Sequence, residues 1–181
     1  MRVLIDTCVL YPTVMREMVL GSAETGAFEP KWSARIEEEW ARASRKLGPT
    51  GEAQARAEIA LVRGRFANTQ IRVPEGLEAR LWLPDAGDIH VLAAAVAGSA
   101  DAIMTLNAKD FPRHILAEEG LKRIDPDAFL VDLWQAMPEQ IEAVGGRVLG
   151  QARRLSGEDW QIRSLLKKAR LPRLAKALSQ G

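Results

Sequence analysis

The chain has 181 residues, of which 47% are hydrophobic, with 25 Lys and Arg against 24 Asp and Glu. This composition excludes a wholly disordered chain, and the length suits one domain with a small appendage. No long apolar run is present, and Asp6 follows only three apolar residues, so we expect a cytoplasmic protein without a membrane span or signal peptide. The single cysteine, Cys8, excludes an internal disulfide and a zinc site built from several thiolates.

The near-neutral net charge conceals an asymmetry along the chain. Residues 1–150 carry 17 basic and 22 acidic residues, whereas the residues from Gln151 onward carry eight basic and two acidic ones. Three interpretations of the basic segment stay open: a contact with the RNA backbone, a helical appendage whose charges stay solvated, or a docking face for an acidic partner.

Short β-branched or alternating runs predict strands at residues 2–5, 69–73, 101–105 and 121–124, with a further extended piece at 28–32. Patterns of apolar residues and breakers predict helices at about residues 10–25, 33–43, 50–62 and 90–97. Alternating strands and helices predict an α/β fold with a parallel sheet covered on both faces. Beyond Pro126 only helical signals occur, so we expect a domain of residues 1–125 and a helical extension of 126–181.

Acidic side chains follow the strands of this predicted sheet. Asp6 ends the first strand, and Asp88 lies in the first turn of the alanine-rich helix. Each has a structural alternative: Asp6 as a helix cap, and Asp85 with Asp88 as a capping pair. Ligands of open parallel sheets bind outside the carboxyl ends of the strands. Converging carboxylates there would shift one another's pKa values or require a cation, and oxygen ligands suit Mg²⁺ or Mn²⁺. Such a cluster is suited to phosphodiester hydrolysis.

Four segments resemble, in order, the motifs of the PIN-domain ribonuclease superfamily and its VapC-type toxins: Val3–Leu10, Trp32–Trp40, Pro84–Ala95 and Ala102–Phe111. The resemblance implies a three-layer α/β/α PIN-like fold with a parallel central sheet and an acidic quartet that holds Mg²⁺ or Mn²⁺. Asp6, Glu39 and Asp88 match the first three acids, with Glu38 as the rival of Glu39. It also implies a cognate antitoxin partner and a homodimer.

The fourth acid is where the sequence departs from the family pattern. Many relatives carry an aspartate where this chain has Asn107, and either Asn107 or Asp110, three residues further on, would complete the site. Gly87 stands where close relatives often have another aspartate, and Cys8 stands where they have Asn or Ser, which predicts the loss of a hydrogen-bonding group near Asp6.

Helical geometry predicts that His90 points about 200° away from Asp88 and packs away from the metal. No histidine lies near Cys8 in the sequence, so we interpret Cys8 as a small buried side chain rather than a nucleophile. The resulting prediction is a metal-dependent endoribonuclease with Asp6, Glu39, Asp88 and Asp110 as catalytic acids and Asn107 among the metal ligands. The alternative is a non-catalytic PIN-like module that binds RNA or protein.

Overall fold

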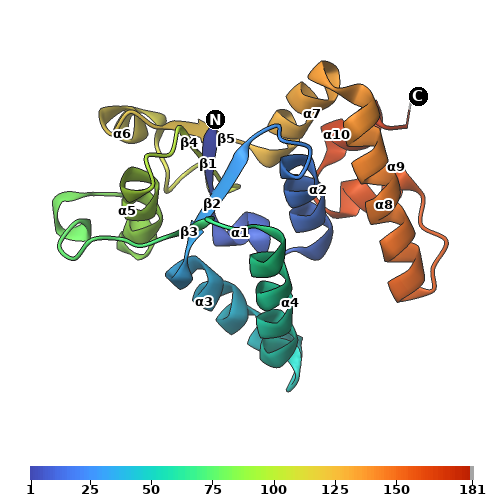
Figure 1. The fold of residues 1–181 in the computed structure, drawn as a ribbon, viewed down its shortest axis with the longest axis horizontal. Helices are drawn as coiled ribbons and strands as arrows, with labels where there is room; N and C mark the ends of the chain where they lie inside the picture. Colours follow the sequence, from blue (N-terminus) through green and yellow to red (C-terminus); the bar gives the residue numbers. More distant parts are fainter. Residues whose placement is uncertain (180–181) are drawn as a thin grey trace. The chain divides into compact units, whose positions relative to one another are not determined.

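The computed structural model describes residues 1–179, which form two compact units (Figure 1). The first unit contains Met1–Tyr11 and Glu29–Arg123, and the second contains Pro12–Phe28 and the described residues from Ile124 to Ser179. The described residues contain no helix with the length and apolar character needed to cross a membrane.

The fold is α/β, with a five-stranded parallel sheet flanked by helices and followed by C-terminal helices, as predicted. The strand order is β3-β2-β1-β4-β5. The strands are β1 (Arg2–Ile5), β2 (Glu29–Ser33), β3 (Gln70–Ile71), β4 (Ala102–Met104) and β5 (Lys122–Ile124). The four predicted strands are confirmed, and the extended piece at 28–32 is β2.

The centre of the sheet is buried on both faces. β1 pairs in parallel with β2 and β4, and its residues Val3, Leu4 and Ile5 are all 0% exposed. Successive side chains of a strand point to opposite faces, so burial of three in a row requires cover on both. Part of that cover is α5 (Ile89–Ala97), which packs against β1, β2 and β4 and ends at Gly98, as expected.

The remaining elements of the first unit position the acidic residues. They are helices α1 (Thr7–Leu10), α3 (Ala34–Ala43), α4 (Gly51–Arg65) and α6 (Arg113–Glu118), and 3₁₀ turns η1 (Ser44–Leu47), η2 (Glu78–Arg80) and η3 (Ala86–Asp88). Ser33 caps α3, as predicted, and accepts a hydrogen bond of 3.3 Å from the Ile36 amide. This cap fixes where α3 begins and therefore which glutamates lie on each of its faces.

The helix predicted over about residues 10–25 is confirmed as α2 (Thr13–Ala23), although it begins later than predicted. Pro12 has no N–H to donate and adopts an extended conformation, which separates α2 from α1. α2 belongs to the second unit, where it packs against α7 (Pro126–Ala136) and α8 (Pro138–Ser156). A Cβ at Gly21 would lie 2.8 Å from Cγ1 of Val144, so the close approach of α2 and α8 requires glycine.

The second unit is completed by α9 (Ile162–Lys168) and α10 (Pro172–Ala177). Four leucines of this segment are buried: Leu165, Leu166, Leu171 and Leu174. The buried Asp127 of α7 accepts hydrogen bonds from the amides of Arg173 and Leu174, at 2.9 and 3.0 Å, and so holds the N-terminus of α10. The appendage is therefore a packed helical unit.

Candidate metal centre

The carboxyl ends of β1 and β4 are joined by a short network around Asp6. The Asp6 amide donates to the Met104 carbonyl at 3.1 Å, and the Thr105 hydroxyl donates to Oδ2 of Asp6 at 2.7 Å. The backbone N–H of Asn107 in turn donates to Oγ1 of Thr105 at 2.9 Å. Asp6 is therefore held as an oriented carboxylate, 7% exposed, at the edge of the sheet where ligands of parallel sheets bind.

Cys8 supplies a second donor to Asp6. Its thiol donates to Oδ2 of Asp6 at 3.0 Å, so the expectation that cysteine leaves this position without a hydrogen-bonding group is wrong. Burial, together with the charge of Asp6, raises the pKa of the Cys8 thiol to about 12. The thiol therefore stays protonated at neutral pH, which fits the interpretation of Cys8 as a donor rather than a nucleophile.

Three carboxylates gather beside this network. Single oxygens of Asp85, Asp88 and Asp110 all lie within 4.8 Å of one another. The side-chain nitrogen Nδ2 of Asn107 donates to Asp110 at 2.7 Å and to Asp88 at 3.2 Å. The fold thus brings Asp88, Asn107 and Asp110 together from two separate segments of the chain.

The charge of this cluster is only partly offset by the groups around it. Burial raises the pKa of Asp88 to about 6, and the charges of Asp6, Asp85 and Asp110 act in the same direction, opposed only in part by His90. A carboxyl group with a raised pKa is one whose ionised form is disfavoured by its surroundings. A divalent cation would relieve this repulsion, and oxygen donors of this kind suit Mg²⁺ or Mn²⁺ rather than a soft metal.

Glu39 reaches the same side of the unit from α3. Its Oε2 accepts from the Thr7 hydroxyl at 2.9 Å, and its Oε1 lies 2.7 Å from Nε2 of the buried His90. Burial alone would raise the pKa of Glu39, but the hydrogen bond and charge of His90 and the bond from Thr7 outweigh it and lower that pKa. Glu39 is therefore a fixed carboxylate, although it lies outside the group of three aspartates.

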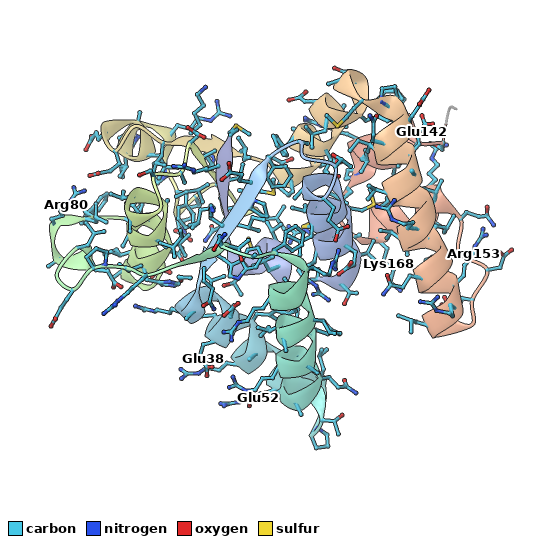
Figure 2. The ribbon with its side chains drawn as sticks, in the orientation of Figure 1. Glu38, Glu52, Arg80, Glu142, Arg153 and Lys168 are labelled. Carbon is cyan, nitrogen blue, oxygen red and sulfur yellow. The ribbon has the colours of Figure 1, made fainter. Side chains whose placement is uncertain are left out.

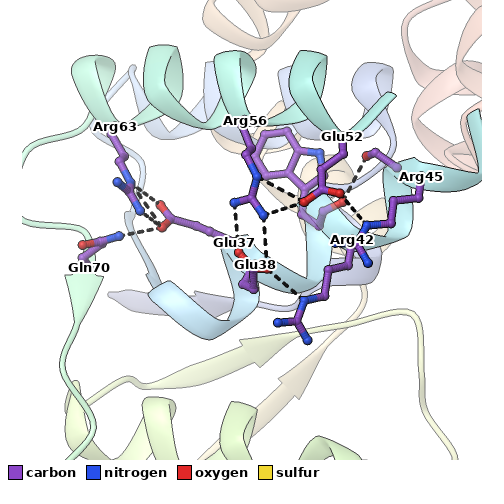
Figure 3. Close-up of polar contacts among 10 residues, drawn as sticks. Glu37, Glu38, Arg42, Arg45, Glu52, Arg56, Arg63 and Gln70 are labelled. Carbon is purple, nitrogen blue, oxygen red and sulfur yellow. Dashed lines mark hydrogen bonds and ion pairs between the residues drawn. The ribbon is translucent and has the colours of Figure 1, made fainter. Parts of the chain in front are cut away.

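The two neighbouring glutamates are engaged elsewhere (Figure 3). Glu38 accepts from Arg42 at 2.8 Å and from Arg56 at 2.9 Å, and hydrogen bonds from these arginines lower its pKa. The buried Glu37 accepts from Trp32 at 2.9 Å and from Arg63 at 3.0 Å. Both thus belong to the packing of α3 in the first unit, and only Glu39 contacts Thr7 and His90.

His90, predicted to pack away from the metal, is buried and contacts Glu39, one of the predicted ligands. Asp88 ends the 3₁₀ turn η3, and His90 lies in the first turn of α5. The contact that matters joins His90 to Glu39, and it depends on how α3 and α5 meet rather than on spacing within one helix.

Asp85 is the residue of the cluster that sequence reasoning assigned to a structural role alone. It caps η3 as expected, with Oδ1 accepting from the Gly87 amide at 2.8 Å, whereas Asp88 makes no capping hydrogen bond. A Cβ at Gly87 would lie 3.1 Å from Oδ1 of Asp85, so a larger residue there would crowd the cap. In the sequence, the feature that indicates a role for Asp85 in the cluster is its position about one helical turn before Asp88.

Comparison with known proteins gives two matches. A family model described as PIN domain matches residues 2–109. The protein named "Putative ribonuclease VapC50" from Mycobacterium tuberculosis (strain ATCC 25618 / H37Rv) is 44% identical over 57 residues, which cover 32% of this chain and 34% of that protein. No solved structure matches the chain. The family match covers more than half of the chain and includes Asp6, Glu39, Asp88 and Asn107, and the chain belongs to the PIN domain family.

Proposed function

We propose that the protein is a divalent-metal-dependent endoribonuclease and the toxin of a toxin–antitoxin pair. The observation that carries this proposal is the cluster of Asp85, Asp88 and Asp110 at the carboxyl end of the sheet, where burial and the neighbouring carboxylates raise the pKa of Asp88 to about 6. The similarity to a protein named as a ribonuclease supports RNA as the substrate. We propose that the protein acts on RNA in the cytoplasm.

The proposed ligands of Mg²⁺ or Mn²⁺ are oxygens of Asp6, Asp88 and Glu39, with Asn107 or Asp110 completing the set. Asp85, the third aspartate of the cluster, adds negative charge beside Asp88. A cation bound there would activate water for attack on the phosphodiester and neutralise the charge that develops on the leaving oxygen. Thr105 and Cys8 hold Oδ2 of Asp6 in one direction, and Thr7 and His90 hold the two oxygens of Glu39.

Asn107 has a distinct part in this proposal. Its amide nitrogen, a donor, faces Asp88 and Asp110, so ligation through Oδ1 requires the amide to turn over. Without the cation, the two hydrogen bonds offset part of the repulsion between the aspartates. Asp110 supplies the negative charge that many relatives carry at the position of Asn107.

We assign the activity to a nuclease domain of residues 1–125, because every site residue lies within that range, and we treat residues 126–181 as a helical extension. A cognate antitoxin and a homodimer remain part of the proposal. The alternative is a PIN-like module that binds RNA or protein without cleaving it. Asn107 in place of a fourth acid is the observation that favours this alternative.

The test is cleavage of several single-stranded and structured RNAs by the full chain in Mg²⁺ and in Mn²⁺. We expect Asp6→Asn and Asp88→Asn each to lower the rate by roughly 10²-fold or more, and EDTA to abolish cleavage. Asp132→Asn, a change at an exposed residue of α7, is the matched control and leaves the rate unchanged.

Two results would contradict the proposal. Variants that cut as fast as the wild type would assign the cleavage to another site or to a contaminant. A wild-type protein that binds these RNAs but cuts none of them in either metal would establish the binding module instead.

A further inference from the structure

The second unit has an open groove with a volume of about 410 Å³, lined by residues of that unit alone. Most of its exposed lining is apolar. The walls come from the start of α2, the last turn of α8, the following loop and α9, and they include Val14, Ala152, Leu155, Trp160, Leu165 and Lys168. This volume is in the range of sites that receive large apolar groups.

The polar atoms at the rim of the groove are already bonded within the unit. The indole nitrogen of Trp160 donates to the Ser156 hydroxyl at 3.2 Å, and the Trp160 carbonyl accepts from Nε of Arg153 at 2.8 Å. Leu155, in contrast, is 71% exposed. The groove therefore offers apolar surface with its rim held in place, and burial of that surface would be favourable at about 25 cal/mol per Å².

Positive charge exceeds negative charge beside this apolar surface. Lys168 lines the groove, and Arg153 and Arg154 precede Leu155 on α8. Figure 2 labels Lys168 and Arg153. Arg153 lies 3.5 Å from the exposed Asp159 of the loop, one of only two acidic residues against eight basic ones from Gln151 onward. An apolar centre beside an excess of basic groups is complementary to a ligand with apolar anchors and carboxylates around them.

RNA fits this groove less well than a peptide does. RNA bound by stacking needs an aromatic face, and the Lys168 ammonium lies over one face of the Trp160 ring, 4.8 Å from its centre, where a base would have to displace it. Phosphates would find the basic groups but would leave the apolar lining uncovered. A helical segment covers both, because its anchors recur on one face every three to four residues and its flanks carry charge.

We propose that this groove binds an acidic amphipathic helix of a partner protein. Its apolar side chains fill the space between α2, α8 and α9, and its carboxylates face Lys168, Arg153 and Arg154. The proposal is independent of the proposed nuclease activity, since all the residues that carry it belong to the second unit.

The test is a selection of displayed random peptides of about 15 residues, some four helical turns, on the full chain. Binders that also bind the Leu155→Ser variant are removed. We expect the remaining peptides to be enriched in Asp and Glu and to carry apolar residues at a spacing of three or four. A synthetic peptide of the most enriched sequence should lose affinity roughly tenfold with Leu155→Ser and with Lys168→Glu.

Two matched controls separate the groove from general effects. Leu61→Ser alters a leucine that is 70% exposed on α4, and Lys176→Glu alters an exposed lysine of α10. Neither change should alter the affinity for the selected peptide. Selection of basic or uncharged peptides, or no enrichment over the Leu155→Ser variant, would overturn the proposal. So would an RNA oligonucleotide whose binding falls with Leu155→Ser while that of the peptide does not.

Discussion

Replacing Asp88 by asparagine is expected to stabilise the cation-free protein. Burial and the charges of Asp6, Asp85 and Asp110 raise the pKa of Asp88 from 3.8 to about 6. The pKa of Asp88 in the folded state lies above its unfolded value. The contribution of this group to the free energy of unfolding is therefore fully present below about pH 4, and it is lost as the pH rises through about 6. Above pH 6 the ionised carboxylate therefore destabilises the fold.

The magnitude follows from the shift. One pKa unit corresponds to about 1.4 kcal/mol, so a shift of about two units sets a ceiling near 3 kcal/mol. Asp88 is only half-buried and solvent screens part of the repulsion, which leaves about 1–2 kcal/mol. Asparagine keeps an oxygen that can accept the hydrogen bond from Asn107 but cannot ionise.

The assay is thermal unfolding, followed by circular dichroism, of the wild type, Asp88→Asn and Asp132→Asn in EDTA at pH 8 and at pH 4. A gain of about 1–2 kcal/mol corresponds to a rise of a few degrees in the midpoint for a chain of this size. We expect this rise for Asp88→Asn at pH 8, little difference at pH 4, and no change for Asp132→Asn. Mn²⁺ should stabilise the wild type more than Asp88→Asn. A variant less stable than the wild type at pH 8, or a gain that persists at pH 4, would refute the reasoning.

Three further predictions concern the supports of the site and of the second unit. His90→Phe removes a partner of Glu39 and should weaken Mn²⁺ binding about 10-fold to 100-fold in calorimetric titration. His90→Gln keeps a hydrogen-bond donor and should retain most of the affinity. Equal losses in the two variants would exclude a positioning role for His90. Mn²⁺ affinity should fall up to tenfold per unit as the pH drops below about 6, because the cation then displaces a proton from Asp88, and a flat profile from pH 7 to 5 would contradict this. Asp127→Ala should cost roughly 1–3 kcal/mol in urea unfolding, since two backbone amides at the start of α10, one of them buried, lose their acceptor. An unchanged midpoint would exclude that role.

Local sequence signals predicted much of the fold. The run from Arg2 to Ile5 is β1, Ser33 caps α3, and Gly98 ends α5, because each of these features depends on the chemistry of a few neighbouring residues. The placement of α2 in the second unit could not be predicted in this way. It depends on a close approach to α8, which is far away in the sequence.

The site shows the same division between local and tertiary information. Asp6 at the end of β1 followed from strand patterning, but the hydrogen bonds from Thr105 and Cys8 that orient it depend on the pairing of β1 with β4. Asp85 was predicted to cap the turn that follows it, and it does, yet one of its oxygens also lies in the cluster with Asp88 and Asp110. One carboxylate can both cap a turn and belong to a carboxylate cluster. The sequence pattern indicates only the cap.

The central claim is that the carboxylates at this edge of the sheet hold one functional divalent cation. Titration of Mn²⁺ into the full chain, with free Mn²⁺ measured by electron paramagnetic resonance, tests it most directly. We expect the wild type to bind Mn²⁺ and the variants Asp88→Asn, Asp110→Asn and Glu39→Gln each to lose affinity by roughly tenfold or more. Glu38→Gln, which alters the neighbouring glutamate held by Arg42 and Arg56, should bind as the wild type does. Binding that is indifferent to Asp88→Asn, or a wild-type protein that binds no Mn²⁺, would contradict the claim.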